Sequence, residues 1–104
     1  MGRYSRKKPQ RLAEKLLQVR LALNLSQTQL LDRLGLKDEL FYTAISGNEL
    51  GSREPTLGEL LEYAQLANVY VDVLIDDSLD LPAELPSQEK SAGVKKTFVR
   101  SSRR

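Results

Sequence analysis

The chain has 104 residues, with 16 Lys and Arg, 14 Asp and Glu, no cysteine and no histidine. Without cysteine, disulfides and thiol catalysis are excluded, and without histidine the commonest general base and the usual zinc ligands are missing. The sequence therefore predicts no catalytic residue, no cofactor and no metal. Because no apolar run is long enough to span a bilayer and no signal-peptide core is present, we expect one small, soluble, cytoplasmic domain with tails.

The charges are unevenly distributed along the chain. Residues 1–20 carry seven Lys and Arg against one acid, and residues 87–104 carry six against one. Residues 21–86 carry three against twelve. Basic ends around an acidic middle are typical of polyanion-binding arms, although solvated tails without a ligand have the same composition.

Residues 1–8 show no apolar periodicity and are interpreted as a basic N-terminal arm. Pro9 suits the first turn of a helix, where its missing N–H costs nothing. From there apolar residues recur at steps of four, three and four, which is one stripe of an amphipathic helix. The stripe consists of Leu12, Leu16, Val19 and Leu23. Asn24 is placed to end this helix in the left-handed conformation.

A capping box opens the second predicted helix, residues 26–34. The Ser26 hydroxyl can accept from the backbone N–H of Gln29, whose side chain can reach back. The buried side of this helix is predicted to be formed by Leu30, Leu31 and Leu34. Gly35 can take the left-handed turn that ends it.

A third helix is predicted over about residues 38–50, with Phe41, Ala44 and Ile45 at helical spacing and a stop near Gly51. Gly47 lies inside this helix, where it costs about 1 kcal/mol relative to alanine. Either the helix is weak or ends early there, or something approaches its backbone closely.

Pro55 keeps the chain irregular before a second capping box, Thr56 with Glu59, which opens a fourth helix. The inward residues of this helix are predicted to be Leu57, Leu60, Leu61, Ala64 and Ala67, with Asn68 as the cap. A short fifth helix at residues 71–75 is expected to close the bundle with Val71, Leu74 and Ile75. The sequence thus predicts an all-α domain of five helices and no strands over residues 9–77.

The composition changes after this domain. Residues 78–104 contain two prolines, several serines, Gly93 and a basic end, which favour an extended, disordered, basic C-terminal tail.

Several ordered matches between about Leu12 and Asp77 resemble one family. They are Ser26-Gln27-x-x-Leu30, Leu34-Gly35-Leu36, Ile45-Ser46, Glu49, Gly51-x-Arg53-x-Pro55 and Leu60-Leu61. The chain looks like the Xre (xenobiotic response element) family of helix-turn-helix domains, to which the phage lambda repressor and Cro belong. The resemblance implies a five-helix, lambda-repressor-like DNA-binding domain with flexible basic termini.

In such a domain the third helix would enter the major groove and read bases. Counting from Ile45 as a core position, the groove side is predicted to carry Tyr42, Thr43, Ser46 and Gly47. Tyr42 and Ser46 can donate and accept hydrogen bonds, and the methyl of Thr43 can contact a thymine methyl. The missing side chain at Gly47 could admit DNA, and Tyr42 could instead be a half-buried core aromatic.

Phosphate contacts set position rather than sequence. Gln27 begins the second helix, where the helix dipole favours a phosphate, and the resemblance implies that role. Lys37 precedes the third helix, and Ser52 and Arg53 follow it. The remaining phosphate-binding candidates lie in the arm: Arg3, Arg6, Lys7 and Lys8.

Two points depart from the family pattern or stay open. The connection between Gly35-Leu36 and Ile45-Ser46 is several residues longer than usual, so it holds either an extra helical turn or a longer loop. Arg53 could pair with Glu49 or Glu54 instead of phosphate. The third helix is also poor in Arg, Lys and Gln.

We expect a sequence-specific transcriptional regulator, a repressor by family association, that binds double-stranded DNA at a palindromic operator as a homodimer. Candidates for the dimer surface are Tyr70, Val73 and Leu79. The alternative is an antitoxin or adaptor-type interaction module that binds a partner protein through the C-terminal tail and also its own promoter.

Overall fold

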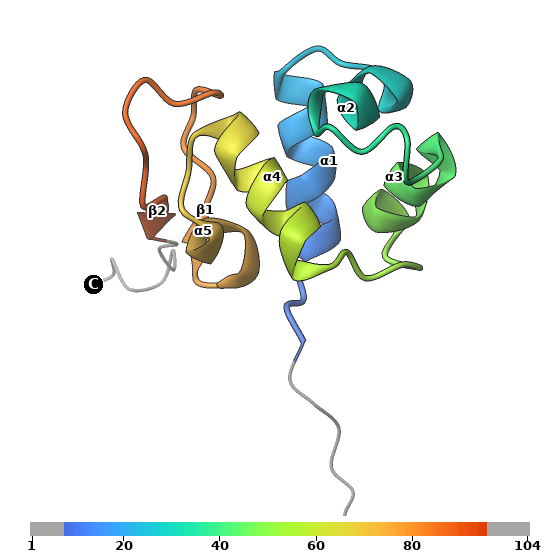
Figure 1. The fold of residues 1–104 in the computed structure, drawn as a ribbon. Coiled ribbons are helices and arrows are strands. Elements are labelled where there is room, and N and C mark those ends of the chain that lie inside the picture. Colours follow the sequence, from blue (N-terminus) through green and yellow to red (C-terminus); the bar gives the residue numbers. More distant parts are fainter. Residues whose placement is uncertain (1–7, 96–104) are drawn as a thin grey trace, which may run out of the picture.

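A computed structural model describes residues 8–95. Five helices and two very short strands make up this part of the chain (Figure 1). In chain order they are α1 (Leu12–Ala22), α2 (Gln27–Arg33), α3 (Tyr42–Leu50), α4 (Leu57–Ala67), α5 (Val71–Ile75), β1 (Leu79–Asp80) and β2 (Val94–Lys95). Helix α1 runs through the middle, with α2 and α3 on one side and α5 with the strands on the other. The expected helical domain is confirmed, whereas both strands lie in the segment after residue 77 that was expected to be a disordered tail, so the all-α prediction for the chain is wrong there.

Local chemistry sets most helix ends as predicted. Both bonds of the capping box at α2 are present, since Gln29 N donates to Ser26 Oγ at 3.0 Å and Ser26 N to Gln29 Oε1 at 2.8 Å. Gly35 is left-handed at φ +75°, and Asn24 and Asn68 are both left-handed at φ +59°. At α4 only half of the second box forms: Thr56 accepts from Glu59 N, but the carboxylate of Glu59 binds elsewhere.

The predicted apolar stripes of α1 and α2 lie in the core. Their buried members are Leu12, Leu16, Val19, Leu30 and Leu31, joined by Leu34 after α2. The face of α4 was predicted only in part, because Glu59 and Tyr63 are buried in place of Leu57 and Leu61. The buried residues of α4 recur at steps of one, three, one and three, and both leucines fall outside that stripe. In α5, Val73 and Leu74 are buried and Ile75 is exposed.

Helix α3 begins at Tyr42 and not near residue 38. The connection is a longer loop in which Glu39 N and Leu40 N both donate to Leu36 O, at 3.0 and 2.9 Å. Leu36 and Leu40 pack against the core, so the loop is anchored at two points. Phe41 then adopts an extended backbone, with φ −98° and ψ 162°, and its side chain is exposed, contrary to the expectation of a helical position.

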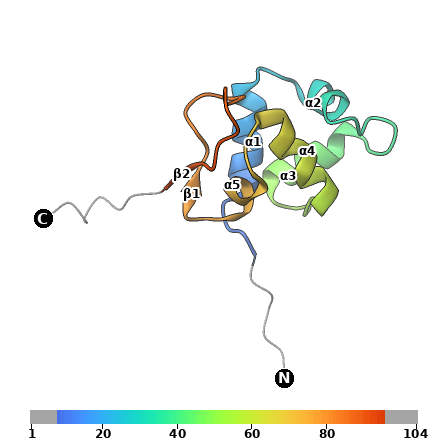
Figure 2. The ribbon, with the colours of Figure 1, turned by 60° about the vertical axis from the view of Figure 1, so that its left-hand side comes forward.

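The chain beyond residue 77 continues to pack on the domain, where we had expected an extended tail. Residues 81–95 form what we call the C-terminal strap, and its Leu81 belongs to the core cluster. Ser91 N donates to Asn68 O at 3.1 Å, and Tyr70 N donates to Ser91 O at 3.0 Å. Antiparallel β1 and β2, with Asp80 opposite Val94, close the strap. In both ribbon views it lies on the α5 side, away from α2 and α3 (Figure 2).

Candidate nucleic-acid interface

The residues predicted to read bases all lie on α3, and three of them present hydroxyl groups. Tyr42 has 54% of its surface exposed, so it is not a core aromatic. Thr43 is also exposed and Ser46 is half-buried. The opposite face of the helix is buried through Ala44, Ile45 and Asn48. Helix α3 therefore carries a polar outer face on an inner face that is fixed in the core.

An ion pair holds α3 to α1. Arg20 Nε donates to Glu49 Oε2 at 2.7 Å, and Arg20 Nη2 donates to Glu49 Oε1 at 3.1 Å. Gln27 Nε2, at the first residue of α2, donates to the same carboxylate at 3.2 Å. Glu49 thus joins three helices. The amide of Gln27, predicted to contact phosphate, lies against α3 and is used in this contact.

A second ion pair holds the loop after α3 to α4. Arg53 donates through Nη1 and Nη2 to the two oxygens of Glu59, at 2.7 and 2.9 Å. Arg53 Nη1 also donates to Oδ1 of buried Asn48 at 2.9 Å. The Arg53 guanidinium lowers the pKa of Glu59, and burial only partly opposes it. Neither Glu49 nor Glu54 is the partner of Arg53, whose charge is engaged inside the protein.

The chain itself approaches the backbone of Gly47. A Cβ at Gly47 would lie 3.0 Å from the Cβ of Arg53 and 3.5 Å from Ser52 Oγ. The Gly47 carbonyl also accepts from Ser52 N at 3.0 Å and Arg53 N at 3.1 Å. The space that we expected to admit DNA at Gly47 is occupied by the following loop, which explains the glycine without a ligand.

Tyr63 lies near these two ion pairs and is fully buried. Its hydroxyl has no hydrogen-bond partner within residues 8–95. Burial raises the pKa of Tyr63 to about 12; the nearby Asn48 amide opposes this rise, although no hydrogen bond of normal geometry reaches the hydroxyl. Nothing in the sequence pattern singled out Tyr63 or Arg20, and Glu59 was predicted only as part of a capping box, because each partner lies on another element.

The other residues predicted to bind phosphate differ in their exposure and in whether their side chains are already paired. Lys37 Nζ lies 3.6 Å from Asp32 Oδ1 with both side chains about two-thirds exposed, so the pair is weak and the lysine is available. Ser52 is exposed, and it lines an open hollow with Arg53 and Lys8. Arg3, Arg6 and Lys7 lie outside the described residues.

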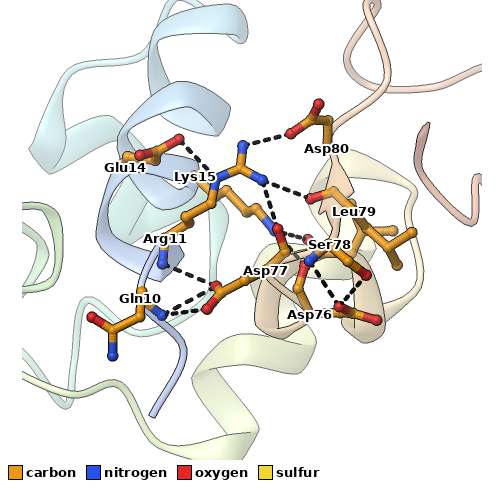
Figure 3. A network of polar contacts seen from close by, with 10 residues as sticks. Gln10, Arg11, Glu14, Lys15, Asp76, Asp77, Ser78, Leu79 and Asp80 are labelled. Atoms are coloured by element: carbon orange, nitrogen blue, oxygen red, sulfur yellow. Dashed lines mark hydrogen bonds and ion pairs between the residues drawn. The ribbon is translucent and has the colours of Figure 1, made fainter. Parts of the chain in front are cut away.

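A network of polar contacts fixes the start of α1 close to this hollow (Figure 3). The carboxylate of Asp77 accepts from Gln10 N at 2.9 Å and from Arg11 N at 3.0 Å. The Arg11 guanidinium donates to Asp80 and to the carbonyl of Asp77. These contacts set where the chain enters α1, beside the turn between α5 and β1.

Buried Lys15 completes this network from α1. Its Nζ donates to Val73 O at 2.8 Å and to Asp76 O at 2.9 Å, two carbonyls at the end of α5. Burial lowers the pKa of Lys15. The stem of this lysine therefore packs in the core while its ammonium group caps α5.

The described surface is acidic. Residues 8–95 hold nine Lys and Arg against fourteen Asp and Glu, and α3 itself has no basic residue. Three of the four arginines in this range, Arg11, Arg20 and Arg53, are paired with carboxylates. Contacts with a polyanion would therefore come from lysines and from the basic ends of the chain, and less from the loop arginine that we had predicted.

The three residues proposed for a dimer surface do not form one exposed patch. Val73 is fully buried, which removes it from any surface. Tyr70 is half-exposed, with Lys90 Nζ 4.6 Å from its ring centroid. Leu79 is half-buried in β1.

In residues 8–95, no helix is both long and apolar enough to span a bilayer. Comparisons with protein-family models, curated proteins and solved structures gave no significant match to this chain.

Proposed function

We propose that this protein is a sequence-specific DNA-binding regulator of transcription, acting as a repressor through a helix-turn-helix of the Xre type formed by α2 and α3. One observation carries this proposal: the hydroxyl-bearing residues Tyr42, Thr43 and Ser46 lie outside the buried face of a helix that an ion pair, Arg20–Glu49, holds to α1. A recognition helix must be held rigidly by the rest of the domain, because hydrogen bonds to base edges depend on fixed geometry.

Phosphate contacts complete this proposal. Lys8, Lys37 and Ser52 are exposed on segments that flank α3 or line the adjoining hollow, and the basic ends add charge. Arg53 acts differently from the sequence-based expectation, because it positions the loop through Glu59. Dimers would place two copies of α3 about one helical turn of DNA apart.

The test is selection of duplexes from random sequence, followed by fluorescence anisotropy between 50 and 300 mM salt. We expect a two-fold-symmetric motif whose binding persists at high salt. Thr43→Ala and Ser46→Ala should change the recovered motif, while Gln65→Ala, on the exposed side of α4, should not. Weak binding that enriches no motif and disappears with salt would refute the proposal.

A second candidate function is an interaction module for a basic protein. It is favoured by exposed leucines on an acidic domain: Leu50 is 79% and Leu57 83% exposed, and Leu61 lies one turn after Leu57. Co-purification of a stoichiometric partner that is lost in Leu57→Ser/Leu61→Ser would support it. Truncations that probe the tail must keep residues 78–95, since the strap packs on the core.

A further inference from the structure

The most exposed aromatic side chain in the described part of the chain stands at the beginning of α3. Phe41 is 81% exposed, directly before half-exposed Tyr42. An extended backbone sends neighbouring side chains to opposite sides. Leu40 accordingly packs inward and Phe41 points out.

The position of Phe41 is fixed. Leu36 O accepts two hydrogen bonds within the preceding loop, and Phe41 O accepts from Ala44 N at 2.9 Å in the first turn of α3. Phe41 is the N-cap residue of α3, yet it offers no side chain that can cap it. A large apolar group is thus held out in water at a site where Ser, Thr, Asp or Asn would stabilise the helix better.

The surroundings of Phe41 limit what it can contact. Asp38 and Glu39 are exposed in the same loop and would repel a phosphate at the first turn of α3, which leaves Lys37, before them, as the phosphate contact of this loop. Tyr42, Thr43 and Ser46 can hydrogen-bond to base edges, but the Phe41 ring has no polar atom. In the major groove the apolar group that distinguishes bases is the 5-methyl of thymine.

We propose that Phe41 is a specificity-determining residue whose ring packs against thymine methyl groups in the major groove. This inference rests on the proposed DNA-binding function and names a contact within it. Phe41 supplies the apolar part of the reading surface, and the three hydroxyl-bearing residues supply its polar part. The longer loop before α3, which departs from the family pattern, is what brings the ring to this position.

The test uses the full chain, the motif recovered by selection, and copies of it with deoxyuridine at each thymine. Deoxyuridine lacks only the methyl group. At one or two positions the wild type should bind about fourfold more weakly for each methyl removed. Phe41→Ala should bind the thymine duplex more weakly and no longer respond at those positions. Val94→Ala, at an exposed apolar residue on β2, should behave as the wild type.

The outcomes separate this inference from the function it rests on. A wild type that selects no motif overturns both. A wild type that selects a motif, with Phe41→Ala unchanged in affinity and thymine response, overturns the inference alone. Weaker binding by Phe41→Ala without any effect of deoxyuridine also overturns it, because the ring would then contact something other than a methyl group. Thermal unfolding by circular dichroism checks that Phe41→Ala folds.

Discussion

Arg20 of α1 binds both carboxylate oxygens of Glu49 in α3, and these side chains are only 16% and 5% exposed. Replacing Glu49 by alanine leaves the Arg20 charge half-buried without its partner. We expect the free energy of unfolding to fall by about 3 kcal/mol, measured by urea denaturation.

A double variant provides the control for this prediction. Arg20→Met/Glu49→Leu removes both charges, and we expect it to recover most of the lost stability, because a buried ion pair replaced by apolar groups is often neutral. If the loss in the double variant equalled the sum of the losses in Arg20→Met and Glu49→Leu, the two side chains would not be coupled, and the prediction would be contradicted.

Tyr63→Phe should stabilise the protein, since it removes a buried hydroxyl that has no hydrogen-bond partner within residues 8–95. The expected gain at pH 7 is about 1 kcal/mol in urea denaturation. A loss of stability would mean that the hydroxyl does make a favourable contact.

The raised pKa of Tyr63 predicts how the stability of the protein changes at high pH. The folded pKa of about 12 lies above the ordinary value of 10.0, so the folded state keeps a proton that the unfolded state loses. The contribution of the protonated Tyr63 to the stability of the folded state is fully present below pH 10 and is lost as the pH rises through the folded pKa. The stability difference between Tyr63→Phe and the wild type should therefore grow between pH 10 and 12, and a constant difference would contradict the prediction.

The Arg53–Glu59 ion pair predicts how the stability of the protein changes at low pH. The folded pKa of Glu59 is lowered, so its stabilisation is present above the unfolded value near 4.5 and is lost as the pH falls through the folded pKa. Glu59→Gln should lose about 2 kcal/mol at neutral pH, between the values for exposed and buried pairs. Its deficit relative to the wild type should shrink below pH 4, as followed by circular dichroism.

Gly93 and Gly35 form a matched pair for testing the strap. Both are left-handed, at φ +83° and +75°, but a Cβ at Gly93 would lie 2.9 Å from Asp80 O and 3.0 Å from Val73 Cγ2. No atom of the described residues lies within 4 Å of a Cβ at Gly35. Gly35→Ala should cost about 1–2 kcal/mol through its backbone conformation alone. Gly93→Ala should cost clearly more in urea denaturation, and equal costs would mean that the strap is not tightly packed.

The sequence predicted those features that neighbouring residues determine. Ser26 with Gln29, Gly35, Asn24 and Asn68 set helix ends within a few residues of themselves, so their chemistry was sufficient. The start of α3 was misplaced because Leu36 and Leu40 anchor their loop by contacts with the distant core.

Features that depend on residues far along the chain were missed, because the local sequence does not show which distant partner a side chain contacts. Arg53 had three carboxylates within six residues, and only the packing of α4 selects Glu59. The strap was interpreted as disordered from its prolines and serines, although Ser91 forms a parallel bridge with buried Val69. The candidate surface on α3 could be predicted by counting from Ile45, whereas the fit of Gly47 against Arg53 could not.

The cap on α1 comes from far along the chain. The N-cap residue Arg11 makes no side-chain capping bond, and its own backbone N–H, like that of Gln10, donates to Asp77, 66 residues after Arg11. On the ribosome α1 is therefore complete well before its cap has been translated, with a delay of about 3–13 seconds at ordinary elongation rates. During that interval the apolar stripe of α1 has neither a fixed start nor the α5 surface to pack on.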